Sequence, residues 1–350
     1  MLQTHTEFGE REMGGERSSV RATVDIPAVR RVPPAGGTGL LVVVLLLGLA
    51  ASFPPSAAAR TTCSYAGAPR NVLTVTVKDI AVGEIRRRGL EIAVRGQDER
   101  LSRCAGGAPT VLNTDTIKVV LVELSFVDID LSGGPFAPGT TLETEGASEI
   151  EIEISNGLGV ADIIGTPGDD EWHWGPGGAN PGLNVNPREA GDQDVDITVT
   201  SDENEAGPLF ASGEGGNDTI VGAPGATVRG VVGAEGGFGD DVLSAPRFDA
   251  SRYALGSAHL DGGFGDDVVT GGALGDELDG GVGNDRVAGG GGADKISGGR
   301  GRDRLSGGAG PDVINSRDFS SDVVSCGSGR DRVNRDARDE VSGCERSGPR

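Results

Sequence analysis

The sequence predicts an all-β fold, and three observations lead to this prediction. Residues 262–315 are six contiguous nonapeptides with one shared glycine-rich pattern. Upstream of them, short segments alternate apolar and polar residues, which is the period of a β-strand. Aromatic residues make up only 4% of the chain and glycine accounts for 61 of its 350 residues. We therefore expect a core built from Val, Ile and Leu on short strands.

Residues 1–59 read as a signal peptide with an extended n-region. An apolar run from Leu40 to Ala51 follows Arg30 and Arg31, and it leads to small residues at 57–59 that suit a signal peptidase. The run is short for a membrane span, so we expect no stable span after cleavage. A membrane anchor that is never cleaved is the alternative, and the true start is either Met1 or Met13.

Residues 60–155 are expected to form a β-rich N-terminal region. The segment "NVLTVTVKD" predicts a strand that buries Leu73, Val75 and Val77, and "LEIAVRG" predicts one that buries Leu90, Ile92 and Val94. "TIKVVLVEL" is more continuously apolar, so we expect it to be more buried.

Two acidic segments of this region could bind calcium, but each has a simpler interpretation. "SEIEIEIS" alternates Ile with Glu, so the glutamates are expected on a solvated strand face. "DIDLSGG" resembles the start of an EF-hand loop, but its twelfth position is Gly139 instead of Glu. We interpret it as a strand that runs into a turn.

Residues 156–235 are expected to form acidic, irregular rungs of a β-solenoid. The stretch from Thr141 to Asp241 holds twenty-one acidic residues against two basic ones, and the whole chain has a formal charge of −22. This charge argues against a nucleic acid or an anionic membrane surface as partner. His173 lies between Trp172 and Trp174, where a packing role is expected.

The six nonapeptides follow the pattern G-G-x-G-x-D-x-U-x, in which U is aliphatic. An Asp is sixth and an aliphatic residue eighth in every copy, and only Leu274 departs from the glycine pattern. Further copies begin at Gly213, Gly236 and Cys326, and degenerate ones at Gly165 and Arg317.

This pattern resembles the RTX, or haemolysin-type, calcium-binding repeat. The resemblance implies a right-handed parallel β-roll over 236–334, with 335–350 as a C-terminal cap and tail. Each nonapeptide would be a six-residue loop and a three-residue strand, and two would make one coil. Asp267, Asp285 and Asp303 would then line one side, and Asp276, Asp294 and Asp312 the other. The order of the parts is also similar to that of secreted actinobacterial calcium-binding proteins.

The resemblance implies several Ca²⁺ ions held by carboxylates and loop carbonyls. Calcium prefers six to eight oxygen ligands, and glycine loops can turn carbonyls inward. The expected ligand residues are Asp218, Asp241, Asp267, Asp276, Asp285, Asp294, Asp303, Asp312 and Asp331, with Asp170 and Asp322 as weaker ones, and Gly263, Gly265, Gly281, Gly283, Gly290, Gly292, Gly299, Gly301, Gly308 and Gly310.

Without calcium, stacked carboxylates about 4.8 Å apart would repel one another. One aliphatic side chain per nonapeptide buries too little apolar surface to offset the entropy of ordering so many glycines. We therefore expect the roll to be unfolded without calcium and folded with it.

Four cysteines follow the signal segment, which agrees with export. Three pairings are possible, and we favour the local ones, Cys63 with Cys104 and Cys326 with Cys344. The second pair is eighteen residues apart, one coil of the implied roll, which would place its Cα atoms about 4.8 Å apart.

We find no H-E-x-x-H or G-x-S-x-G motif and no zinc-like cysteine spacing, so no catalytic residue and no cofactor other than calcium is predicted. The first hypothesis is a non-catalytic, secreted or surface-associated calcium-binding protein, with an extracellular or cell-wall glycan as a candidate partner. The alternative is a carbohydrate-active or other hydrolase that uses the acidic region 141–241 and has the roll as a calcium-dependent stabiliser.

Overall fold

A computed structural model gives the arrangement of the strands. It describes residues 60–79, 81–96, 101–123, 125–134, 150–155, 159–175, 182–185, 197–200, 208–222, 227–228, 231–248 and 257–347. The predicted signal segment 1–59 lies outside these residues. No helix long and apolar enough to cross a bilayer occurs in the described part of the chain.

The described residues form two large sheets and one two-stranded sheet. The first sheet has, in order across it, β1 (Arg60–Ala66), β2 (Val72–Lys78), β5 (Thr116–Leu121), β7 (Glu151–Ser155), β11 (Ile197–Thr200), β10 (Gly182–Val185), β9 (Glu171–Trp174), β13 (Thr219–Gly222), β16 (Val242–Ser244), β19 (Val268–Thr270), β21 (Arg286–Gly291), β23 (Arg304–Ala309), β25 (Val323–Ser328) and β27 (Glu340–Ser342).

The second sheet has β28 (Arg346–Ser347), β26 (Arg332–Arg335), β24 (Val313–Ser316), β22 (Lys295–Ser297), β20 (Glu277–Asp279), β18 (Ser257–Phe264), β15 (Val231–Phe238), β12 (Leu209–Ser212), β8 (Val160–Ile164), β6 (Phe126–Asp130), β3 (Val82–Arg88) and β4 (Glu91–Arg95). The small sheet pairs β14 (Thr227–Val228) with β17 (Arg247–Phe248).

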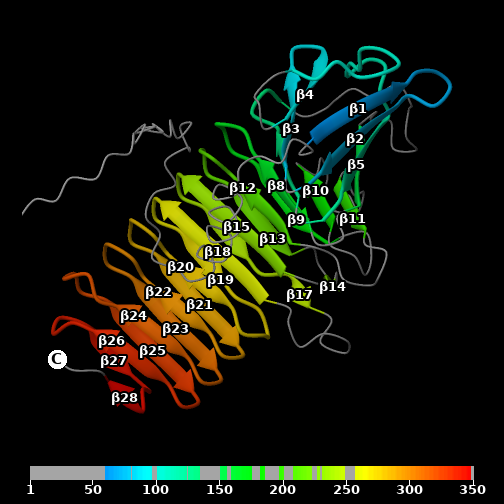
Figure 1. The fold of residues 1–350 in the computed structure, drawn as a ribbon. Coiled ribbons are helices and arrows are strands. Elements are labelled where there is room, and N and C mark those ends of the chain that lie inside the picture. Colours follow the sequence, from blue (N-terminus) through cyan, green and yellow to red (C-terminus); the bar gives the residue numbers. More distant parts are fainter. Residues whose placement is uncertain are drawn as a thin grey trace, which may run out of the picture. The chain divides into compact units, whose positions relative to one another are not determined.

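Successive strands alternate between the two large sheets, as the colours of Figure 1 show from β15 to the C-terminal strands. One strand of each sheet therefore makes one coil, and strands of successive coils pair in parallel. Among the described strands, antiparallel pairs are formed only by β1 with β2, β3 with β4, and β10 with β9 and β11. The prediction of an all-β parallel roll is confirmed.

The N-terminal strands belong to the same two sheets as the nonapeptides. In β2 the predicted inward residues Leu73, Val75 and Val77 are all fully buried. In β7 the isoleucines at 152 and 154 are buried, and Glu153 forms an outward ion pair with Lys118 of β5 at 2.6 Å. Alternation therefore predicted both faces of these strands.

Two expectations in this region were wrong. Leu90 is 54% exposed, because it lies in the two-residue turn between β3 and β4 and not on the buried face with Ile92 and Val94. The segment around β5 is not continuously buried: Ile117, Val119 and Leu121 point inward, but Val122 is 40% exposed beyond the strand. Its outer face meets solvent, so only alternate residues are enclosed.

The other predicted features of this half follow the sequence. "DIDLSGG" is strand β6 followed by a turn, and the Asp130 carboxylate accepts the N–H of Ser132 at 2.9 Å. Trp172 and Trp174 on β9 are fully buried, and His173 between them lies 3.2 Å from Glu171. The packing interpretation of this segment agrees with these contacts.

In the nonapeptide region each eighth-position aliphatic residue is at most 2% exposed, which confirms the predicted core: Val269, Leu278, Val287, Ile296, Leu305 and Ile314. β19, β20 and β22 have the expected three residues. β21 and β23 have six, because pairing between coils continues into the first residues of the next loop, as between Gly290 and Gly308.

Candidate metal centre

The sixth-position Asp residues form two buried columns along the coils. The longer column, here the long ladder, consists of Asp170, Asp218, Asp241, Asp267, Asp285, Asp303, Asp322 and Asp339. The short ladder consists of Asp276, Asp294, Asp312 and Asp331. All twelve side chains are at most 7% exposed.

Within each ladder a single hydrogen bond links one coil to the next. The backbone N–H of Asp267 donates to Oδ1 of Asp285 at 2.9 Å, and the N–H of Asp285 donates to Oδ1 of Asp303 at 3.0 Å. The short ladder repeats this link, for example from Asp294 to Asp312 at 3.0 Å. Each carboxylate therefore uses one of its oxygens to accept an N–H group of the preceding coil.

The second carboxylate oxygen has no donor in the interior of either ladder. Within the described residues Oδ2 is buried and unpartnered in Asp218, Asp241, Asp267, Asp285, Asp294, Asp303, Asp312, Asp322 and Asp331. A buried carboxylate oxygen without a partner is costly. These nine oxygens are an acceptor set that a cation would complete.

Three end positions differ from the interior. Oδ2 of Asp170 accepts the N–H of Thr166 at 2.8 Å, and Oδ2 of Asp276 accepts that of Gly272 at 2.6 Å. Oδ2 of Asp339 accepts from the Ser316 hydroxyl at 2.9 Å and from the N–H of Asp336 at 3.0 Å. At these three ends, N–H and O–H groups of the protein therefore bind the oxygen that has no donor in the interior of the ladders.

Burial and like charge raise the pKa of the interior carboxyls. Burial raises the pKa of Asp285 to about 8, with the neighbouring carboxylates of Asp303 and Asp267 adding to the rise. The same cause raises the pKa of Asp294 to about 7. A carboxylate that resists ionisation beside other carboxylates gains most from a divalent cation.

First-position glycines make room for these carboxylates. A Cβ on Gly280 would lie 2.7 Å from Oδ2 of Asp285 and 2.6 Å from the carbonyl oxygen of Gly298 on the next coil. A Cβ on Gly289 would likewise meet Oδ2 of Asp294 at 2.3 Å. The unpartnered oxygen therefore converges with a backbone carbonyl at a place where no side chain fits.

The glycines predicted as ligand positions are required by backbone geometry. Nine of the ten have φ between +89° and +140°, and Gly283 is the exception. A Cβ on Gly283 would meet the carbonyl of Gly265 at 1.7 Å, so close stacking of the loops requires glycine there. Sequence reasoning missed the first-position glycines and Asp339, the latter because "RDARDE" lacks the glycines that reveal a repeat.

A third row, the Asx row, runs beside the long ladder at the fifth position of the repeats. Oδ1 of Asp240 accepts the N–H of Asp266, and Oδ1 of Asp266 accepts that of Asn284, at 2.8 and 2.7 Å. Asp169 and Asn217 precede them in the same pattern, which ends at the N–H of Arg302. In this row the side chain reaches forward to the following coil, whereas the ladder Asp reaches back.

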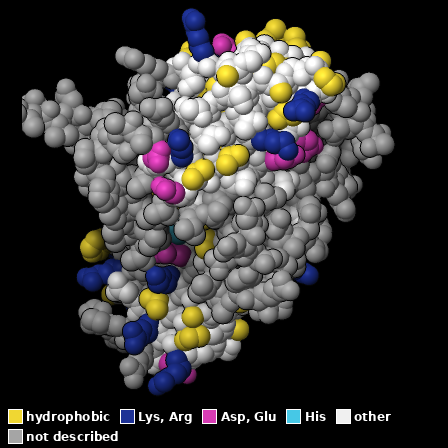
Figure 2. Space-filling view, turned by 45° about the vertical axis from the view of Figure 1, so that its right-hand side comes forward, with side chains coloured by type: hydrophobic (Ala, Val, Ile, Leu, Met, Phe, Trp, Pro, Cys, Tyr) yellow, Lys and Arg dark blue, Asp and Glu magenta, His cyan; other side chains and the backbone are white. Residues whose placement is uncertain are grey.

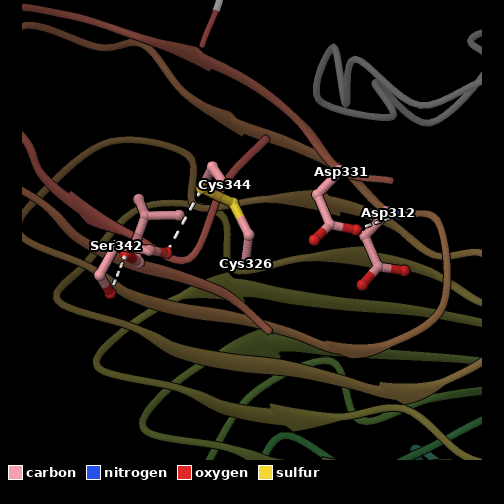
Figure 3. The surroundings of a disulfide bond; sticks show 6 residues. Asp312, Cys326, Asp331, Ser342 and Cys344 are labelled. Carbon is pink, nitrogen blue, oxygen red and sulfur yellow. Dashed lines mark hydrogen bonds between the residues drawn. A yellow bond between two sulfur atoms is a disulfide. The ribbon is translucent and has the colours of Figure 1, made fainter. Parts of the chain in front are cut away.

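Each of the two disulfides joins cysteines of one local pair. Cys63 is bonded to Cys104 and Cys326 to Cys344, with Cα atoms 4.6 and 5.1 Å apart. Figure 3 shows the second disulfide near Asp312 and Asp331, the last two members of the short ladder. The bond ties one coil to the next where the ladder stops.

The oxygen set, the glycine loops and the repeat period agree with one comparison. A family model for RTX calcium-binding nonapeptide repeats matches in four copies, over residues 210–228, 256–278 and 279–314. These residues are RTX calcium-binding nonapeptide repeats. No curated protein and no solved structure matches it.

RTX repeats bind Ca²⁺, and the residues of this chain fit that ion. Unpartnered carboxylate oxygens and inward carbonyls are the ligands that calcium prefers. Among the described residues no three His, Cys, Asp or Glu side chains converge on one point. Backbone carbonyls would therefore supply much of each ion's shell.

Proposed function

We propose that the chain is a secreted protein whose C-terminal coils fold when calcium fills the two ladders outside the cell. The observation that carries the proposal is the set of nine buried Oδ2 atoms without a donor. The ligands would be these oxygens, together with loop carbonyls such as that of Gly298.

Three of the four ladder ends, at Asp170, Asp276 and Asp339, would not need the ion, whereas Oδ2 of Asp331 is as open as those of the interior. Asp170 and Asp276 were expected among the ligands, and they stay weaker candidates because N–H groups already bind their Oδ2 atoms. Asp339 would close the long ladder through Ser316. Calcium would therefore occupy the interior coils first.

Export is supported by two features of the chain and by the usual calcium affinity of extracellular modules. Residues 1–59 have the order of a signal peptide, and all four cysteines are in disulfides. Extracellular modules bind calcium at about 10⁻⁴–10⁻³ M, far above cytosolic levels. The C-terminal coils would cross the membrane unfolded and fold only after export.

We propose a non-catalytic role, structural or adhesive, at the cell surface or in the medium. Asp170, Asp218 and Asp241, three of the described acidic residues in region 141–241, belong to the long ladder and would serve calcium there. Much of the acidic region 141–241 lies outside the described residues, and the hydrolase hypothesis for it stays a hypothesis.

The test is a calcium titration of the purified chain, followed by far-UV circular dichroism and with bound calcium measured by mass spectrometry of the metal. We expect β signal to rise cooperatively with calcium and to fall in EDTA. Magnesium is the control ion, because it demands a smaller octahedral shell and should not replace calcium. A full, cooperative β spectrum in EDTA would contradict the proposal.

A further inference from the structure

The net charge of the chain conceals where its charges lie. Residues 280–345 hold ten Lys and Arg against eleven Asp and Glu, which is a formal charge of −1. Seven of the eleven acids are ladder residues that point inward: Asp285, Asp294, Asp303, Asp312, Asp322, Asp331 and Asp339. Four acids then remain against ten bases, so the outer surface of these coils has a formal charge of +6.

Four arginines concentrate this charge on two adjacent coils. Arg304 pairs with Arg286 in register across β23 and β21, and Arg300 and Arg302 lie in the loop that precedes β23. All four are exposed, and within the described part of the chain none is in an ion pair. We call these four residues the basic edge. Figure 2 shows Lys and Arg side chains at the lower end of one face, with hydrophobic side chains between them, and further ones on the upper part.

The nearby acids do not neutralise the edge. Asp318 on the following coil accepts the N–H groups of Gly301 and Ser320 at 2.8 and 2.7 Å. Asp266 on the preceding coil accepts both nitrogens of Asn284 at 2.7 and 3.0 Å. Both carboxylates accept hydrogen bonds from amide groups and keep their charge, but four guanidinium groups outnumber them, so the edge stays positive.

An exposed apolar row continues the edge along the coils. Arg300 pairs with Val282, Val282 with Phe264, and Phe264 stacks on Phe238 with ring centroids 5.0 Å apart. The two Phe side chains are 43% and 65% exposed. From Phe238 to Arg300 the row crosses four coils at strand spacing, a length of about 15 Å. A ligand that contacts both ends must be extended, as a chain of several sugar units is.

We propose that the basic edge and this apolar row bind an anionic polysaccharide, and that they do so only when calcium has folded the roll. The inference rests on the proposed function, because the edge exists only in stacked coils. Arginine pairs with carboxylate, sulfate or phosphate groups through its planar fork, and the apolar faces of sugar rings pack on exposed aromatic rings.

A nucleic acid fits this surface less well. Asp240 and Asp266 are exposed, and each lies two positions after a Phe of the apolar row. The regularly spaced phosphates of a nucleic-acid backbone would be repelled there, whereas the apolar face of a sugar ring can pack on the neighbouring Phe. A bilayer is disfavoured by the same carboxylates.

The test measures binding of the full chain to immobilised dextran sulfate, with neutral dextran of equal length as the matched ligand. In calcium we expect salt-dependent binding to dextran sulfate and none to dextran. R300Q/R302Q/R304Q should weaken binding about tenfold, since each exposed charge pair contributes about 0.2–1 kcal/mol. R70Q/R88Q/R103Q removes three exposed arginines from the N-terminal coils and should stay within about twofold of wild type.

Two controls separate the possible failures. Calcium titration by circular dichroism on the same variants shows whether the roll folds; if wild type does not respond to calcium, the proposed function fails. If wild type folds but the two triple variants bind dextran sulfate equally, the basic edge is wrong and calcium bridging explains the binding. Tighter binding to double-stranded DNA or to anionic vesicles than to dextran sulfate would overturn the choice of a glycan.

Discussion

The coils at the two ends of the described chain share one topology but have different interiors. Around β5 and β6 the interior is filled by Ile117, Val119 and Ile129, and up to residue 164 the only buried charged side chain in the described residues is Asp130. Around β21 to β24 each nonapeptide buries one aliphatic residue and one ladder carboxylate, such as Val287 and Asp285.

This difference teaches that parallel coils can be stabilised in two ways. Large apolar side chains exclude water by themselves, and their contribution needs no ligand. Carboxylates in a column destabilise the stack until a cation neutralises them, as the raised pKa of Asp285 indicates. The N-terminal coils are therefore expected to be independent of calcium and the C-terminal coils to depend on it.

Removing calcium should have the largest effect, because it should unfold the C-terminal coils and leave the N-terminal coils folded. In EDTA we expect amide protection in β19 to β26 to fall by about two orders of magnitude or more, and protection in β2, β5 and β6 to change little. Hydrogen exchange with mass spectrometry measures both regions in one sample. Equal loss of protection in β5 and β21 would show that the two halves fold as one unit.

Replacing one ladder carboxylate should have the next largest effect. Asp285→Asn keeps an oxygen for the N–H of Asp267 but loses the anionic Oδ2, so we expect the calcium midpoint of folding to rise about tenfold. Asp266→Asn is the matched control: it removes the same charge from the Asx row, where Asn217 and Asn284 already serve. Similar midpoints for the two variants would reject the ladder as the metal site.

The position of an Asp within its ladder should have a smaller effect on the calcium midpoint of folding. Asp294 has carboxylate neighbours on both sides, Asp276 and Asp312, whereas Asp331 is the last described member of the short ladder. Because repeat arrays behave as sums of nearest-neighbour terms, Asp331→Asn should shift the logarithm of the calcium midpoint about half as much as Asp294→Asn. Isothermal titration would also show the larger loss of bound ions in Asp294→Asn.

The smallest effect is expected on the outer face of β18. Asp261 lies between Glu235 and Asp279 on neighbouring strands, and burial followed by the charge of Asp279 raises its pKa to about 7. The folded state therefore holds this proton more tightly than the unfolded chain, and Asp261 costs stability as pH rises from about 4 to about 7.

We expect Asp261→Asn in saturating calcium to raise the melting temperature by about 2–4 °C at pH 8. The gain should shrink as pH falls toward about 5, because the wild-type carboxyl is then protonated in the folded state. Differential scanning calorimetry measures both. Ser297→Asn, which changes an uncharged residue of the same row, is the control. A gain that does not vary with pH would contradict the assigned cause.

The sequence predicted the ladder residues where the repeat spacing is regular, but not which Asp residues stack where the spacing varies. An eighteen-residue period is enough to place Asp267 and Asp285 in one ladder. The links from Asp170 to Asp218 and from Asp218 to Asp241 span 48 and 23 residues, and no period reveals that these side chains stack. Alternation likewise predicted strands β2 and β7, but not that each of them pairs in parallel with β5. The pattern shows which face of a strand is buried and not which strand is its partner.

The hydrogen bonds of the long ladder and of the Asx row run in opposite directions, so each coil that both rows cross has two different faces. At one coil boundary the N–H of Asp285 donates to Asp303 of the next coil, while the N–H of Arg302 on that next coil donates back to Asn284. A cut there would leave an unmatched donor and an unmatched acceptor on each broken face, and the two faces would be complementary. Truncated copies would therefore tend to join head to tail, because a contact between two different faces does not close into a dimer. At Asp339, Oδ1 accepts from the N–H of Asp322, and Oδ2 accepts from Ser316 and Asp336, so both oxygens of the last ladder carboxylate are bound within the chain.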